Sequence, residues 1–198
     1  MLYPVRAAII SVAFLMASIA GAEAQFGVPL NRTDPRMEPV AVRELVASYC
    51  RMDYAGARIN PGDWTKLAPL VSWQTNPDFT LMMVTTRFDV DPEPVLQHGK
   101  YLVTVHYRLF GKYDLAEGYS HESANSVEDV HFVVAEVNGD WRISEAEPGY
   151  PHPSRSIVLQ WLNKKIAETQ DPASRTIYQH AVQELQPQKA SPPASERP

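Results

Sequence analysis

The chain has 198 residues and a formal net charge of -5, from 18 Lys and Arg against 23 Asp and Glu. This length is enough for one domain with its own hydrophobic core, and the acidic balance argues against a nucleic-acid-binding surface, which needs clustered Lys and Arg. Cys50 is the only cysteine, so no intramolecular disulfide can form and we expect a buried, structural thiol rather than a reactive one.

The first residues are typical of a secretory signal peptide. Arg6 gives an early positive charge, residues 7–20 are apolar apart from two serines, and Ala22-Glu23-Ala24 has small residues at both positions that a signal peptidase reads. The alternative is an uncleaved membrane anchor, but the apolar run is shorter than the roughly 20 residues that cross a bilayer. We therefore predict cleavage after Ala24, no membrane anchor after processing, and a secreted or periplasmic protein.

The remaining chain divides by composition. After the signal peptide at 1–24, residues 25–38 have no periodic apolar pattern and are expected to form a flexible leader. We predict a single α+β domain over 39–170. Residues 171–198 are polar, and we expect there an exposed helix over 173–185 followed by a disordered tail rich in Pro and Ser.

Two helices are predicted at the start of the domain. Apolar residues recur at helical spacing over 39–57, with Pro39 at the favoured first position. A turn at 60–62 follows, and Asp63 can cap a second, short helix that ends near Val71.

Four strands are predicted next, over 79–90, 101–112, 127–137 and 140–145, with a long loop over 113–126. The second strand alternates cleanly, placing Tyr101, Val103, Val105, Tyr107 and Leu109 on one face. Asn138-Gly139 predicts a tight hairpin turn because both residues tolerate positive φ. Prolines 148, 151 and 153 are expected to end the sheet, and Ser154 to cap a last core helix.

This order predicts an α+β layout in which helices cover one face of a curved antiparallel sheet. Over residues 39–147 the chain resembles the nuclear transport factor two-like superfamily. The resemblance rests on the first helix with Tyr49 and Asp53, on Gly62-Asp63-Trp64, and on the hairpin residues 138–143. It implies a cone-shaped fold with a pocket between the helices and the concave sheet. Because this superfamily includes enzymes and binding modules, the fold does not decide the function.

Asp53 is the best candidate for acid–base chemistry. Isomerases of the fold that the resemblance implies use a desolvated carboxylate as base and a tyrosine or acid to hold the oxyanion. Tyr49 lies four residues before Asp53, on the same helical face. We favour the other interpretation, in which Tyr49 belongs to the core and Asp53 lies exposed or pairs with Arg51 or Arg58 at the surface.

A metal site has weaker support. His106 and His131 can be neighbours on adjacent strands, and Asp129 would complete a two-histidine, one-carboxylate set. We favour a plain polar sheet face beside Arg108. The sequence has no nucleophile elbow, phosphate loop or dinucleotide motif, so no cofactor is predicted.

Two functions follow from these observations. The favoured one is a non-enzymatic extracytoplasmic domain that binds a small apolar ligand or a protein partner, with homodimer formation through the outer sheet face as one form of partnership. The alternative is an isomerase- or dehydratase-like acid–base enzyme, with Asp53 and Tyr49 as catalytic candidates. The residues predicted to contact a ligand are Tyr49, Asp53, Trp64, Tyr107 and Trp141.

Cleavage of the predicted signal peptide can be tested directly. Protein isolated from its native host should begin at Gln25, because the small residues at Ala22 and Ala24 direct cleavage there. N-terminal sequencing checks this, and a retained Met1 would contradict it.

Overall fold

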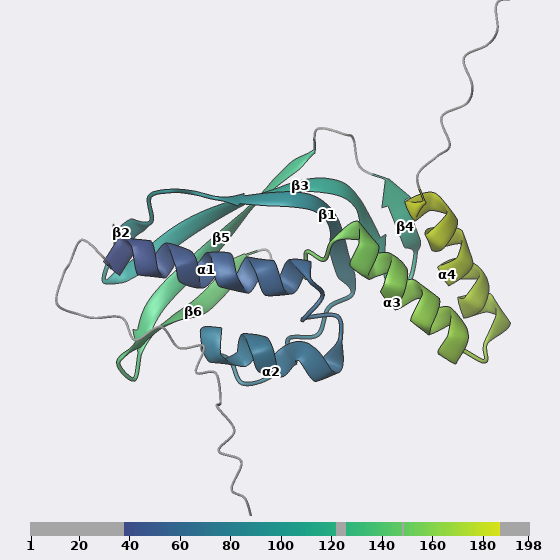
Figure 1. The fold of residues 1–198 in the computed structure, drawn as a ribbon, viewed down its shortest axis with the longest axis horizontal. Helices are drawn as coiled ribbons and strands as arrows, with labels where there is room; N and C mark the ends of the chain where they lie inside the picture. The colour runs from purple at the N-terminus through teal and green to yellow at the C-terminus, as the bar shows by residue number, and fades with distance from the viewer. Residues whose placement is uncertain (1–37, 122–125, 148, 187–198) are drawn as a thin grey trace, which may run out of the picture. The chain divides into compact units, whose positions relative to one another are not determined.

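The structure is a computed structural model that describes residues 38–121, 126–147 and 149–186 (Figure 1). The predicted signal peptide, the leader up to residue 37 and the tail from 187 lie outside the described residues. The helices are α1 (Glu38–Tyr54), α2 (Trp64–Leu67), α3 (Arg155–Glu168) and α4 (Pro172–Leu185), with 3-10 turns η1 (Pro61–Asp63) and η2 (Ala68–Leu70) on either side of α2. The strands are β1 (Leu81–Val90), β2 (Val95–Gln97), β3 (Lys100–Asp114), β4 (Gly118–His121), β5 (Val127–Val137) and β6 (Asp140–Glu147).

The strands form one antiparallel sheet, which confirms the α+β class. Its order is β1-β3-β5-β6, and the short strands β2 and β4 both pair with β3. The long β3 alternates buried and less buried residues along its length. Asn138 and Gly139, with φ of 54° and 92°, make the turn between β5 and β6. The alternation and the hairpin are as the sequence predicts.

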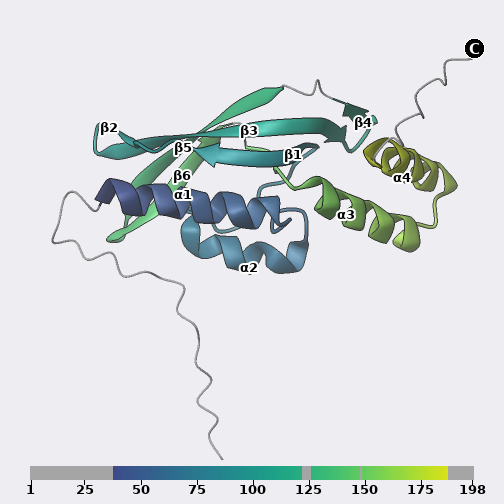
Figure 2. The ribbon, with the colours of Figure 1, turned by 45° about the horizontal axis from the view of Figure 1, so that its top comes forward.

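Helix α1 lies across one face of this sheet (Figures 1 and 2). Val42, Val46 and Tyr49 of α1 are buried with alternate residues of the sheet. Those sheet residues include the predicted face of β3 and residues of β5 and β6: Tyr101, Val103, Val105, Tyr107, Leu109, Val130, Phe132, Val134 and Ile143. The apolar stripe of α1 and the inner face of the sheet therefore bury each other and form the first core cluster.

A second core cluster joins α3 and α4 to one end of the sheet. Val158 and Leu162 of α3 pack with Ala181 and Leu185 of α4, together with Met82, Val84 and Tyr113 of the sheet. The predicted helix over 173–185 exists, and most of its residues are exposed, but Ala181 and Leu185 are 1% and 0% exposed. These two members of its four-residue apolar repeat therefore form a buried face, while Ile177 stays 40% exposed.

Several local expectations were wrong. The expected loop over 113–126 contains β4, and β2 lies just after β1, because strands of three or four residues give little periodic signal. The first helix ends at Tyr54 rather than residue 57, and it already includes Glu38 of the predicted leader. Asp63 and Ser154 occupy the N-cap positions of α2 and α3 without a capping side-chain hydrogen bond.

All described residues fall in one compact unit. None of the helices among them combines the length and the apolar composition that crossing a membrane requires.

We predict that α4 contributes to stability through its buried face. Replacing Leu185 by Ala should lower the free energy of unfolding by about 2–5 kcal/mol, because it leaves a cavity in the second core cluster. The matched control is Ile177→Ala on the same helix, where the side chain is 40% exposed and the loss should stay below about 1 kcal/mol. Urea denaturation of the two variants measures both values. Equal losses would show that α4 does not pack as described.

Candidate functional site

The proline-rich segment after β6 lies between the edge of the sheet and the end of α1. The carbonyl groups of Pro151 and Pro153 accept hydrogen bonds from the backbone N–H groups of Met83 and Thr85 in β1, at 2.9 Å each. The sequence alone predicts only that these prolines end the sheet. Proline keeps its carbonyl acceptor while lacking an N–H, so the segment extends the sheet edge through its carbonyl groups.

The residue between these prolines points its backbone N–H the other way. The N–H of His152 donates to the Asp53 Oδ2 atom of α1 at 2.9 Å. The imidazole of His152 is buried, with Nδ1 3.9 Å from the same oxygen. Two residues on, the N–H of Ser154 donates to the carbonyl of Tyr54 at 2.9 Å. Asp53 thus ties this segment to the end of α1.

A second carboxylate completes this buried network. The Nε2 atom of His152 lies 3.0 Å from Glu128 Oε2, and the hydroxyl of Tyr150 donates to Glu128 Oε1. Tyr107 stacks on the His152 ring, with centroids 4.0 Å apart. We name Asp53, Glu128, Tyr150 and His152 the buried acid cluster. Its members come from α1, β5 and the proline-rich segment.

Asp53 is only 1% exposed, so the expectation of a surface carboxylate was wrong. Burial raises the pKa of Asp53 above its ordinary value, while the charges of Arg58 and His152 and the N–H of His152 oppose that rise. Its Oδ1 atom has no hydrogen-bond partner. Arg51, the other arginine considered as a partner, lies on the surface within 3.6 Å of Glu44.

Arg58 is buried beside this cluster, at 3% exposed. Its Nη1 donates to the carbonyl of Gly149 at 2.6 Å, and its Nε to Asn76 Oδ1 at 3.5 Å. The side-chain amide of Asn76 in turn donates to the carbonyl of Arg58 at 2.7 Å. The Nη2 atom has no partner. The hydrogen bonds of the guanidinium therefore go to neutral acceptors, while its charge interacts with the nearby Asp53 carboxylate.

The other buried groups nearby hold their protons. Burial raises the pKa of Cys50 to about 12, and the hydroxyl of Tyr107 donates to Cys50 Sγ at 3.1 Å. Burial also raises the pKa of Tyr49 and of Tyr107. A thiol with so high a pKa is a poor nucleophile, so the expected buried, structural thiol is confirmed.

A cleft opens next to the cluster, over the edge strand β6. Its volume is about 280 Å³, and its lining residues are Tyr49, Arg58, Trp73, Pro77, Ser144, Glu145, Ala146, Glu147 and Gly149. Tyr49 and Arg58 belong both to the cleft wall and to the surroundings of Asp53. Asp53 itself does not line it. The Asp53 carboxylate is therefore closed off from the cleft, and Arg58 is a neighbour of both.

The five predicted ligand residues do not form one site. Tyr49, Asp53 and Tyr107 come together around the buried acid cluster, and of the five only Tyr49 lines the cleft. Trp64 is half-buried, and its Nε1 donates to the carbonyl of Gln74 at 3.2 Å. Trp141 is half-buried against Tyr101 on the inner side of the sheet. Both tryptophans contribute to the core.

Sequence reasoning missed His152, Tyr150 and Glu128. The order Pro151-His152-Pro153 could have indicated the role of His152, because proline lacks a backbone N–H and the histidine supplies the only one of the three residues. Nothing local, however, relates it to Asp53, which lies 99 residues earlier.

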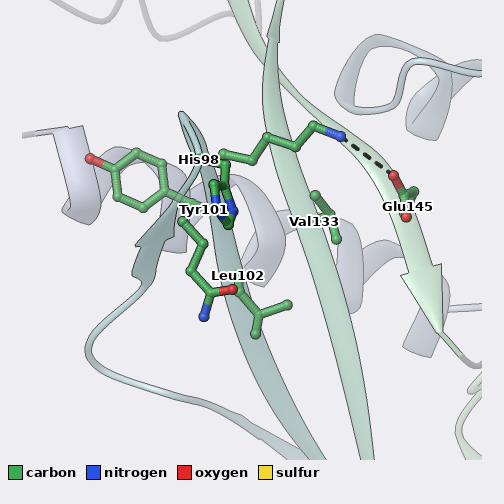
Figure 3. Close-up of a pocket in the computed structure, with 7 residues that line it drawn as sticks. His98, Tyr101, Leu102, Val133 and Glu145 are labelled. Atoms are coloured by element: carbon green, nitrogen blue, oxygen red, sulfur yellow. Dashed lines mark ion pairs between the residues drawn. The ribbon is translucent and has the colours of Figure 1, made fainter.

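The outer face of the sheet carries a second hollow of about 300 Å³ near the β2–β3 turn (Figure 3). It is bordered by Leu102 and Val133, and by Glu145, to which Lys100 reaches within 3.7 Å. A homodimer through this outer face stays a prediction.

The predicted polar face also lies on this outer side. His106 lies between Asp129 and Asp91, at 2.6 and 2.9 Å, and hydrogen bonds to both raise its pKa. His131 contacts Thr104 instead, at 3.3 Å. Across the described ranges, no group of three His, Cys, Asp or Glu side chains is arranged to hold a metal ion.

Comparison with known proteins adds no identification, since no family model, curated protein or solved structure matches this chain.

We predict that Asp53 is required for stability. Asp53→Ala should lower the free energy of unfolding by about 3–5 kcal/mol, because it leaves the Arg58 charge without compensation in the interior and His152 N–H without an acceptor. Asp53→Asn keeps an oxygen acceptor and should cost less. Chemical denaturation compares the two variants, and an alanine variant as stable as wild type would contradict the role of this tie.

A comparison of the wild type with Asp53→Asn tests the protonation of Asp53. Its pKa is raised in the folded protein above the ordinary 3.8, so the folded state binds this proton more tightly than the unfolded state. Wild-type stability relative to Asp53→Asn should therefore fall as pH rises from about 3.8 through the raised pKa. Urea midpoints measured across this range check the sign, and a difference that grows with pH would contradict it.

Proposed function

We propose that this protein is a secreted or periplasmic domain that binds a small ligand in the cleft over β6. The observation that carries the proposal is the cleft itself. Its wall combines the rings of Tyr49 and Trp73 with Pro77 and Ala146, and a buried arginine borders it. Apolar walls with a few fixed polar groups are the usual composition of ligand sites.

The size of the cleft limits what it can hold. At about 280 Å³ it lies just below the roughly 300–1,000 Å³ range of ligand pockets. The ligand is therefore a small molecule with an apolar body that packs between Tyr49 and Trp73. The interior of the sheet is filled by the first core cluster, so the ligand lies at the edge of the sheet rather than deep within it.

We also propose that the fold belongs to the nuclear transport factor two-like superfamily. The support is a helix packed on the inner face of a twisted antiparallel sheet, together with the Asn138-Gly139 hairpin. The resemblance implies a pocket between helix and sheet. Here Tyr49 of α1 and Ala146 of β6 contribute to the same cleft.

An acid–base enzyme is the second candidate. It is favoured by one observation, a buried Asp53 whose pKa is raised by desolvation, as an acid or base working near neutral pH requires. Binding explains the arrangement better. The Asp53 carboxylate does not reach the cleft wall, whereas a base must come within hydrogen-bond distance of the proton that it removes.

Filling the cleft should abolish binding. The probe is 3-phenylpropan-1-ol, a small neutral molecule with an apolar body, followed through the NMR shift of the Trp73 indole N–H. The wild type should show a saturable shift and Ala146→Trp none, because the larger ring occupies the cleft. Val133→Trp fills the outer hollow instead and should bind like wild type. No shift in the wild type, or equal loss in both variants, would contradict the cleft as the binding site.

A further inference from the structure

We infer that the ligand of the cleft carries a carboxylate, and that Arg58 and Trp73 bind this group. The inference rests on the proposed function and names the chemical class of the ligand. It is drawn from two N–H donors that have no acceptor in the structure and that belong to residues of the same cleft wall: Arg58 Nη2 and Trp73 Nε1.

The first observation is the state of the Arg58 charge. The side chain is 3% exposed, its two hydrogen bonds go to the neutral oxygens of Gly149 and Asn76, and none of the ion pairs among the described residues includes it. A buried charge is costly unless an opposite charge pairs with it directly. Arg58 therefore has no anion hydrogen-bonded to it, although the Asp53 carboxylate acts on its charge through space.

The second observation is the donor beside it. The indole of Trp73 offers one N–H and no acceptor, and this N–H has no partner although the atom is buried. A buried donor without an acceptor loses its hydrogen bonds to water and gains none in return. The guanidinium N–H and the indole N–H belong to one cleft wall and both lack an acceptor, and a carboxylate has two oxygens that accept only. Both nitrogens are shielded from solvent, so binding requires the two side chains to turn toward the cleft.

Three carboxylates of the protein surround this position and must be weighed against it. Asp53 interacts with the charge of Arg58, but no hydrogen bond or ion pair among the described residues joins the two side chains. Glu145 and Glu147 line the cleft. Both are exposed, and Glu145 also faces Lys100 at 3.7 Å. Exposed charges are screened by water, whereas the buried guanidinium acts at low dielectric. We therefore expect the buried guanidinium to outweigh these carboxylates and the ligand to be an anion. Preferential binding of a cationic ligand would contradict this.

Three compounds with one apolar body distinguish these outcomes. They are 3-phenylpropanoate, 3-phenylpropanamide and 3-phenylpropylamine, each titrated into the full mature chain and followed by calorimetry and by the Trp73 indole shift. We expect the carboxylate to bind about tenfold more tightly than the amide, as a charge-assisted bond to arginine provides. Equal affinities, or tightest binding of the amine, would overturn the carboxylate assignment while the proposed function stands. Absence of any shift at Trp73 with all three would contradict both.

Two variants test whether Trp73 and Arg58 cause the preference for a carboxylate over an amide. Trp73→Phe keeps an aromatic wall and removes one N–H, and should lower carboxylate affinity about threefold to tenfold with little change for the amide, both followed by calorimetry. Arg58→Gln should abolish the difference between carboxylate and amide. The control, Arg142→Gln, removes a nearby arginine that donates to the carbonyl of Val71 at 3.4 Å and does not line the cleft. It should leave the difference unchanged. If Arg58→Gln does not fold, the Trp73 variant and the three ligands decide: an unchanged preference in Trp73→Phe would overturn the assignment to this wall.

Discussion

The hydrogen bond from the His152 N–H to the buried Asp53 carboxylate is the constraint on which the rest of the site depends. It joins the last turn of α1 to a segment whose proline carbonyls continue the edge of β1. That segment leads directly into α3, which begins at Arg155. Three elements distant in the sequence, namely α1, the sheet edge and α3, therefore meet at this segment, and the Asp53 carboxylate is its side-chain tie to α1. Without it the buried His152 N–H would have no acceptor, and an unpaired buried donor costs free energy.

Burying this carboxylate determines which residues surround it. A charge in the interior requires opposite charge and donors, and here Arg58 and His152 supply them. Glu128 and Tyr150 then satisfy the far side of the His152 ring. The stacked ring of Tyr107 and the thiol of Cys50 close the cluster with groups that keep their protons. Such a network stabilises the structure only when its members are satisfied. The remaining unpaired atoms, Asp53 Oδ1 and Arg58 Nη2, are therefore the informative exceptions.

The sequence predicted the parts of this fold that depend on local periodicity. The alternation in β3, the apolar stripe of α1 and the Asn138-Gly139 turn all follow from neighbouring residues and agree with the structure. The strands β2 and β4 were missed because a strand of three or four residues is too short to show an alternating pattern. Their pairing is also decided by β3 rather than by their own sequence. The burial of Asp53 was missed for a different reason. On the helix it lies at the edge of the apolar stripe, and only a segment 99 residues later covers it.

Arg58 links the stability of the fold to the chemistry of the cleft. Its Nη1 holds the carbonyl of Gly149 at the start of the proline-rich segment, its charge opposes the rise in the pKa of Asp53, and its side chain borders the cleft. One guanidinium offers five N–H groups in a rigid plane, which is enough for both tasks. Lysine has a single ammonium group on a flexible stem and cannot reproduce this geometry. The same arginine that balances Asp53 in the interior is therefore also the group to which we assign the proposed preference of the cleft for an anionic ligand.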